Sequence, residues 1–209
     1  MKYEWKKIEK DNYLPKEKPT LIDIHKMKFF VIEGKGDPNT SLEFQDTIEA
    51  LYSLSYSIKM RPKSGITPDG YFYYTVFPLE GVWDIFDKEK GYSVLNKDNL
   101  VYSLMIRQPD FVTDDLARKT ILLVKQKKPK ESLEKVEFET IEEGLCIQMM
   151  HIGSYDDEQK TFDIMEQYCE ENNLVRSSHT HREIYLSDPR RVSKDKMKTV
   201  LRFMVKYKQ

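Results

Sequence analysis

The stretch HREIYLSDPRR, residues 181–191, predicts a strand that carries a carboxylate on one face and ends at an Asp-Pro turn. In an extended chain the side chains alternate between two faces, so Glu183 shares its face with His181 and Tyr185. Ile184 lies on the other face with the remaining apolar residues. One face can therefore join a core, whereas the other displays a carboxylate between two rings.

Outward from this strand, the chain shows the same order of elements twice: strand, helix, strand, strand. Apolar residues recur at helical spacing after the apolar runs at 28–32 and at 145–151. Thr40 has capping-box spacing before the first helix, and Thr113 is placed to cap another. The expected strands are 28–32, 71–77, 101–107, 145–151, 181–189 and 200–207, and the expected helices begin near Thr40, Thr113 and Tyr155.

This repeat predicts a duplicated βαββ unit. We expect an α+β fold in which two βαββ modules form a curved antiparallel sheet, with helices on one face and a ligand groove on the other. Ile184 would then face the helix and Glu183 the groove. Residues 1–20 are expected to form a polar, partly ordered arm, and residues 21–209 a single domain. A lysine-rich linker, KQKKPKE, would join its two modules, which are expected over about 27–125 and 132–209.

The composition argues against several classes of partner. Among 209 residues, 34 basic and 35 acidic side chains nearly cancel, and no basic face for nucleic acid is visible. No apolar run approaches the ~20 residues that span a bilayer, and the N-terminus is too polar for a signal peptide. We therefore expect a cytoplasmic protein with no nucleic-acid or membrane partner, in which Cys146 and Cys169 are buried free thiols. The oligomeric state is left open.

Three motifs resemble the GyrI-like small-molecule-binding proteins, a family with a duplicated, SHS2-type module that is related to the effector-binding domains of AraC-type regulators. The motifs are HIGSY at 151–155, EIYLSDP at 183–189 and PLEGVW at 78–83, and the resemblance covers about Met27 to Tyr207. The chain has no spare segment for a helix-turn-helix. It therefore resembles the stand-alone members of the family.

The resemblance implies a site as well as a fold. In the family, the carboxylate that matches Glu183 lies in an aromatic pocket and meets cationic or polar aromatic ligands. Some stand-alone members are hydrolases that open the strained ring of cyclopropanoid genotoxins. Two functions are therefore open: a hydrolase of reactive aromatic electrophiles, or a non-catalytic binder or sensor of cationic lipophilic compounds. Val82, where the subgroup often has leucine, and Arg182 beside the acid leave the choice of ligand open.

The candidate site residues follow from the strand faces and from the resemblance. The candidates for catalysis are Glu183 and Tyr185, and those for ligand binding are Trp83, Tyr74, Phe72, Tyr155, His181 and Glu80. Glu183 could instead be a solvated acid on an edge strand, and Trp83 could be a packing residue. Tyr155 could serve only to start a helix. A slip of one residue in the register of 71–77 would turn Phe72 and Tyr74 to the other face.

The chemistry of such a site follows from its parts. Apolar surroundings disfavour an ionised carboxylate, so Glu183 could act as a base near neutral pH and take a proton from water. Opening a cyclopropanoid ring moves electrons toward a conjugated carbonyl, and the phenol of Tyr185 or Tyr155 could stabilise that oxygen. Flat ligands would stack on Trp83 and Tyr74. His179 and His181 lack further metal ligands in the sequence, so neither a metal nor an organic cofactor is expected.

Overall fold

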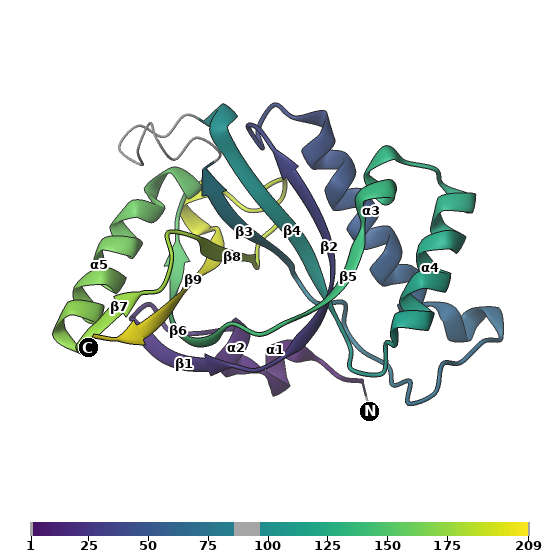
Figure 1. The fold of residues 1–209 in the computed structure, drawn as a ribbon, viewed down its shortest axis with the longest axis horizontal. Coiled ribbons are helices and arrows are strands. Elements are labelled where there is room, and N and C mark those ends of the chain that lie inside the picture. The colour runs from purple at the N-terminus through teal and green to yellow at the C-terminus, as the bar shows by residue number, and fades with distance from the viewer. Residues whose placement is uncertain (1, 86–96, 209) are drawn as a thin grey trace. The chain divides into compact units, whose positions relative to one another are not determined.

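The computed structural model describes residues 2–85 and 97–208, which fall into two compact units (Figure 1). Unit 1 comprises Met1–Glu4 and Met27–Ile141, and unit 2 comprises Trp5–Lys26 and Glu142–Gln209. Each unit combines an antiparallel sheet with helices. The α+β class and the antiparallel strand pairing expected from the sequence are therefore confirmed.

Unit 1 is built on strands in the order β3-β4-β2-β5, with α3 packed on one face. Phe44 of α3 meets Tyr102 of β4 edge to face, with ring centroids 5.1 Å apart. Further along the same two elements, Gln108 Nε2 donates to Ser55 Oγ over 2.9 Å. The elements are β2 (Met27–Lys35), α3 (Leu42–Lys59), η1 (Arg61–Ser64), β3 (Leu79–Ile85), η3 (Lys97–Asn99), β4 (Leu100–Gln108), α4 (Asp114–Lys127), η4 (Glu131–Lys135) and β5 (Glu137–Ile141).

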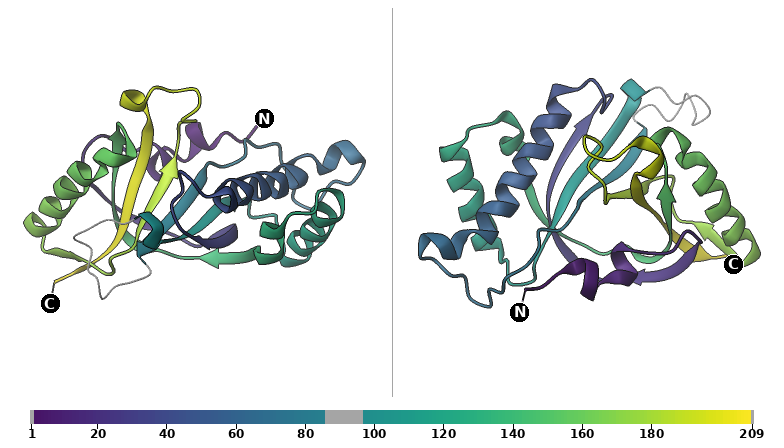
Figure 2. Two further views of the ribbon diagram at one scale, coloured as in Figure 1. Left: turned by 90° about the horizontal axis from the view of Figure 1, so that it is seen from above. Right: turned by 180° about the vertical axis from the view of Figure 1, so that it is seen from behind.

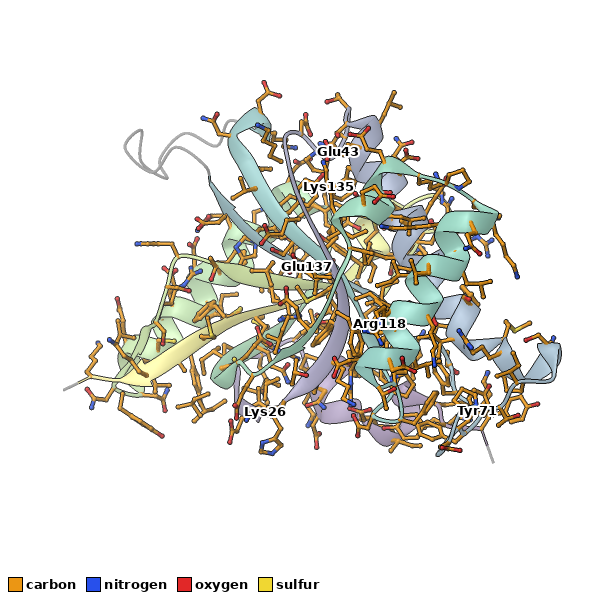
Figure 3. All side chains as sticks on the ribbon, turned by 45° about the vertical axis from the view of Figure 1, so that its right-hand side comes forward. Lys26, Glu43, Tyr71, Arg118, Lys135 and Glu137 are labelled. Carbon is orange, nitrogen blue, oxygen red and sulfur yellow. The ribbon has the colours of Figure 1, made fainter. Side chains whose placement is uncertain are left out.

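The start of α3 lies one residue later than the predicted capping box. Ser41, and not Thr40, is the cap, because its Oγ accepts a hydrogen bond from Phe44 N over 3.2 Å. Glu43 forms an ion pair with Lys135 of η4, at 2.6 Å (both labelled in Figure 3). The first turn of α3 is thereby tied to the segment that leads into β5.

Unit 2 is built on strands in the order β1-β6-β9-β8, and β7 pairs with the end of β9. The helix α5 covers one face, where its Phe162, Met165 and Cys169 pack in one core with apolar residues of β6 and β9. The elements are α1 (Trp5–Ile8), α2 (Lys10–Tyr13), β1 (Thr20–Ile24), β6 (Gly144–Ile152), η5 (Tyr155–Asp157), α5 (Glu158–Glu171), β7 (Leu174–Arg176), β8 (His181–Tyr185), η6 (Lys194–Lys196) and β9 (Lys198–Tyr207).

The two units share one strand order, as a duplication requires. The order β5-β2-β4-β3 in unit 1 corresponds to β1-β6-β9-β8 in unit 2, and the repeated modules are β2-α3-β3-β4 and β6-α5-β8-β9. The outer strand of each sheet comes from the other half of the chain. β1 directly precedes β2 but pairs with β6, and β5 directly precedes β6 but pairs with β2. Neither outer strand was predicted from the sequence, so this exchange was not expected.

The prediction of a strand at 71–77 is wrong. In that segment Tyr74 forms an isolated bridge with Tyr3, and the neighbouring residues are not in a strand. No strand was predicted between 77 and 101, but the structure forms β3 there, and residues 86–96 lie outside the described residues.

Ring packing explains this error. Phe72 and Tyr74 both contact Phe111, with ring centroids 5.4 and 6.1 Å apart. Tyr71, labelled in Figure 3, donates its hydroxyl to the Lys59 carbonyl at the end of α3 over 2.8 Å. Aromatic residues are enriched wherever rings can pack, in strands and elsewhere. Their density in 71–77 therefore indicated burial without indicating an extended, paired backbone.

The N-terminal segment, predicted to be a partly ordered arm, contains the short helices α1 and α2 (right-hand view of Figure 2). Trp5 and Tyr13 are both buried, and their rings meet with centroids 5.1 Å apart. The segment therefore contributes to the core of the protein. Of the helices in the described part of the chain, none is long and apolar enough to cross a membrane.

Candidate functional site

Strand β8 places Glu183 on the face of unit 2 that α5 covers. Glu183 pairs with Leu201 of β9, which shares a core with Phe162 of α5. Ile184 pairs with Val200 and lies on the opposite face. The predicted assignment of faces, with Ile184 toward the helix, is therefore wrong. Alternation along a strand separates two faces, but it does not say which of them a helix will cover.

Three polar groups meet on the helix-covered face. His181 Nε2 lies 3.0 Å from Glu183 Oε1. Glu158, the first residue of α5, completes the group, and one ligand atom of each of the three residues lies within 4.8 Å of the others. Glu158 is 7% exposed and Glu183 is 8% exposed. The two carboxyl groups are therefore close neighbours that are largely shielded from bulk water.

Two ionised carboxylates at this separation would repel each other. At an effective dielectric constant of about 20, the Coulomb repulsion between two unit negative charges less than 5 Å apart is more than about 3 kcal/mol. Burial raises the pKa of Glu158 well above its usual range, and the charge and hydrogen bond of Glu183 raise that pKa further. The proximity of the two groups therefore favours one negative charge on the pair over two.

Two tyrosines stand beside the carboxyl groups. The rings of Tyr155 in η5 and Tyr185 in β8 meet edge to face, with centroids 5.8 Å apart. Burial raises the pKa of Tyr155 to about 12, and nearby carboxylates, Glu183 foremost, act in the same direction. The phenol of Tyr155 therefore stays protonated near neutral pH and can donate a hydrogen bond.

The turn before α5 depends on Gly153 and His151. Gly153 has a φ of 143°, a conformation that residues with a side chain rarely adopt. His151 Nε2 lies 3.0 Å from the Ser154 carbonyl, and its Nδ1 lies 2.9 Å from Thr161 Oγ1. In the neutral ring, Nε2 can donate to the carbonyl while Nδ1 accepts from the hydroxyl. These contacts hold the start of α5 on β6.

The opposite face of unit 2 carries a buried ion network. Arg182 Nε donates to Glu143 Oε1 over 2.9 Å, and Arg202 Nη1 donates to Glu143 Oε2 over 3.3 Å. Arg202 also donates to Gln148 Oε1 and to the Asn12 carbonyl. Burial alone would raise the pKa of Glu143, but the two guanidinium groups outweigh it and lower that pKa. Arg182 therefore belongs to this structural face and not to the candidate site.

Trp83 lies in unit 1, on the face that α3 covers. It pairs with Tyr102 of β4, and its ring lies 5.4 Å from that of Tyr102 and 6.0 Å from that of Phe44. The Trp83 side chain is buried among these rings. Glu80, three residues earlier in the same strand, is also buried but lies on the other face. The structure therefore does not bring Trp83 and Glu80 to one surface of the sheet.

The pairing register gives Glu183 an equivalent position in unit 1. Glu183 pairs with Leu201, and Gly81 pairs with Leu104. Leu201 pairs in turn with Met149, four positions before Gly153, and Leu104 pairs with Ile32, four positions before Gly36. Because Gly81 has no side chain, only unit 2 places a carboxylate at this position.

Phe72 and Tyr74 belong to a different cluster of rings in unit 1. Their neighbours are Tyr3, Tyr71 and Phe111. Tyr74 is almost fully buried, and burial raises its pKa. Phe72 is 37% exposed, so its ring has more solvent-accessible surface than that of Tyr74.

Glu158, which lies in the same group as the predicted carboxylate, was not predicted from the sequence. A signal was present: Glu158, Phe162, Met165 and Cys169 follow a helical spacing, so the acid continues the apolar stripe of α5. An acid in line with such a stripe is expected to be buried when its helix packs. Two carboxylates and an imidazole are also donors that a divalent metal ion accepts. The expectation that no metal is required stays a prediction.

The fold and the site define a class of protein. A duplicated α+β module with a shielded carboxyl pair and adjacent tyrosines has the chemistry of a small-molecule-binding protein. The chain belongs to the GyrI-like family, because the GyrI-like small molecule binding domain matches residues 17–206. The resemblance expected from the three motifs is therefore confirmed.

Solved structures agree with this membership. A protein described as a hydrolase from Listeria innocua is 37% identical, with 98% of this chain and 100% of that chain covered and a TM-score of 0.87. An uncharacterized conserved protein from Listeria innocua is 38% identical, with 98% and 100% covered and a TM-score of 0.90. The EcmrR C-terminal domain, 12% identical with 91% and 98% covered and a TM-score of 0.53, shows a likeness of fold alone. A comparison with curated proteins gave no match.

Proposed function

We propose that the protein hydrolyses strained aromatic electrophiles such as cyclopropanoid genotoxins, with Glu183 as the base that activates water. The observation that carries this proposal is the shielded carboxylate of Glu183, held beside His181 and Glu158 and next to two tyrosines. The full-length similarity to a protein described as a hydrolase supports the reaction type. The substrate class comes from the family resemblance.

The proposed reaction adds one water molecule to the substrate. Glu183 takes a proton from water while the water oxygen forms a bond to a cyclopropane carbon. The strained carbon–carbon bond breaks, and its electron pair moves into the conjugated ring carbonyl. That oxygen becomes a phenolate, which is then protonated from solvent, and Glu183 returns its proton to solvent. No oxidant, reductant or cofactor enters this balance.

The tyrosines have a defined place in this mechanism. Because the Tyr155 phenol stays protonated, it can donate a hydrogen bond to the oxygen on which charge develops. Tyr185 packs against Tyr155 and is the second candidate for that donor. A donor placed to meet charge that forms only in the transition state lowers the barrier more than it strengthens substrate binding.

The proposal is tested by incubating the purified protein with a cyclopropanoid and analysing the mixture by mass spectrometry. We expect a product heavier than the substrate by one water molecule, formed in proportion to the amount of enzyme. Incubation in ¹⁸O-labelled water should place the label in the product. Recovery of unchanged substrate, with the protein folded, would contradict hydrolysis of this class.

A binder without catalytic activity is the second candidate. The observation that favours it is the acidic character of the site, where two carboxyl groups lie beside aromatic rings. Such a surface complements a cationic aromatic compound by charge and by ring contact. Tight binding of such compounds without any water-added product would support this function over the first.

For ligand binding in unit 1 we predict that Trp83→Ala weakens the binding of planar aromatic ligands by about 1–3 kcal/mol, because a large apolar surface is lost. The measurement is a fluorescence or calorimetric titration under conditions where circular dichroism shows a folded variant. Tyr207→Ala, which removes an exposed ring at the end of β9, is the matched control. Unchanged affinity in folded Trp83→Ala would assign Trp83 to packing against Phe44 and Tyr102.

A further inference from the structure

Glu158 is a buried acid that the proposed mechanism does not use. Its Oε1 has no hydrogen-bond partner among the described residues, although its side chain is 7% exposed and reaches the site that contains Glu183. One oxygen atom of each carboxyl group lies within 4.8 Å of the other. A carboxylate can only accept hydrogen bonds, so a hydrogen bond between the two groups needs a proton on one of them.

Among the described residues near the pair, the charged groups are acidic or already form ion pairs of their own, as Arg190 does with Asp188. Tyr155 and Asp156 lie just before α5, and His181 is on β8. Both ring nitrogens of His151 on β6 form hydrogen bonds, one with Thr161 and one with Ser154. Arg176 on β7 forms its ion pair with Glu166, which lies in the later part of α5. In the described part of the chain neither Glu158 nor Glu183 forms an ion pair with a lysine or an arginine. The start of α5 favours negative charge only modestly, so a cationic ligand would stabilise a second charge on the pair.

We propose that Glu158 and Glu183 hold one proton between them, and that a permanently cationic aromatic ligand binds with release of that proton. The proton passes from the Glu158 carboxyl group to solvent, with His181, whose side chain is 24% exposed, as the adjacent group that meets water. Glu158 remains as a carboxylate that faces the cation. This inference rests on the proposed function, because it takes Glu183 as part of the ligand site.

Proton release makes the site distinguish cationic from neutral ligands. A neutral aromatic compound leaves the proton in place, so its affinity does not depend on the ionisation of Glu158. A cation displaces the proton, so its affinity increases with pH by up to about tenfold per pH unit while the pair still holds the proton. The two carboxyl groups titrate as a pair, and the proton count belongs to the pair as a whole.

The test uses N-methylacridinium as the cationic probe and acridine, which is neutral at about pH 8, as its uncharged counterpart. Calorimetric titrations in phosphate and in Tris separate the heat of binding from the heat of buffer protonation. We expect wild-type protein to release up to about one proton per N-methylacridinium and none per acridine. Glu158→Gln should bind N-methylacridinium without releasing a proton, and its affinity should become independent of pH.

The controls separate failure of this inference from failure of the proposed function. Glu170→Gln, the same change at an exposed position of α5, should behave as wild type. If wild type binds both probes without proton release, the shared proton is refuted while the ligand site stands. If it binds neither probe, the ligand site and the shared proton are both refuted.

Two further outcomes would overturn the inference. Proton release that disappears in His181→Gln but persists in Glu158→Gln would place the proton on the imidazole. Release that depends on added zinc and is abolished by EDTA would show that a metal ion, and not a proton, occupies the pair. Circular dichroism and thermal unfolding of each variant exclude loss of fold as the cause.

Discussion

Turnover of a strained aromatic electrophile is expected to fall by roughly 10²–10⁴-fold in Glu183→Gln, the usual contribution of a positioned general base. The amide keeps the size of the carboxyl group and can still accept a hydrogen bond, but it cannot take a proton from water. The substitution therefore removes the chemical step while leaving the shape of the site. The measurement is the single-turnover rate of formation of the water-added product.

Binding and chemistry should separate in this variant. A neutral aromatic ligand should bind Glu183→Gln nearly as it binds wild type, because the substitution removes charge and not apolar surface. Glu170→Gln on α5 is again the control for the effect of the amide itself. Turnover that survives Glu183→Gln would show that the catalytic assignment is wrong, and Tyr155 and Tyr185 would be the next residues to test. A loss of cation binding with no turnover in wild type would favour the binder.

Glu143→Gln is expected to destabilise the protein by about 3–5 kcal/mol, because it removes the carboxylate that two buried guanidinium groups share. The side chains of Arg182 and Arg202 are each 3% exposed, and both donate hydrogen bonds to Glu143. Urea unfolding followed by circular dichroism measures this difference. Glu142→Gln is the matched control, because its neighbouring, exposed carboxylate forms a surface pair with Lys26 and should cost no more than about 1 kcal/mol.

The same network predicts a dependence of stability on pH. The pKa of Glu143 is lower in the folded state than its usual value of 4.5, because the two guanidinium groups outweigh burial. A lowered folded-state pKa contributes stability above the unfolded value, and that stability is lost as the pH falls through the folded value. Wild type should therefore lose stability on acidification below about pH 4.5 more steeply than Glu143→Gln. Parallel curves for the two proteins would contradict this account of the network.

Local signals predicted most of the elements. Thr113 accepts a hydrogen bond from Leu116 N over 3.2 Å, so the cap predicted for α4 is confirmed. The strands expected at 28–32, 101–107, 145–151 and 200–207 lie within β2, β4, β6 and β9. These predictions succeeded because apolar periodicity and capping are properties of consecutive residues.

Other features depend on partners far away in the sequence. The exchange of β1 and β5 is a choice between pairing partners, and nothing in either five-residue strand specifies that choice. The aromatic segment at 71–77 forms ring contacts instead of a ladder, because Phe111 and the end of α3 provide places for its side chains. Capping and periodicity contain no information about either arrangement.

The sequence by itself determined that the chain has two βαββ modules, that Glu183 shares a strand face with His181 and Tyr185, and that the motifs are those of a GyrI-like protein. Only the tertiary structure decided that this face is the one under α5, with Glu158 beside Glu183 and with Arg182 turned into an ion network on the opposite face. The physical reason is that alternation along a strand is a local property of the backbone. Which face a helix covers is set by packing between elements that the chain brings together only on folding.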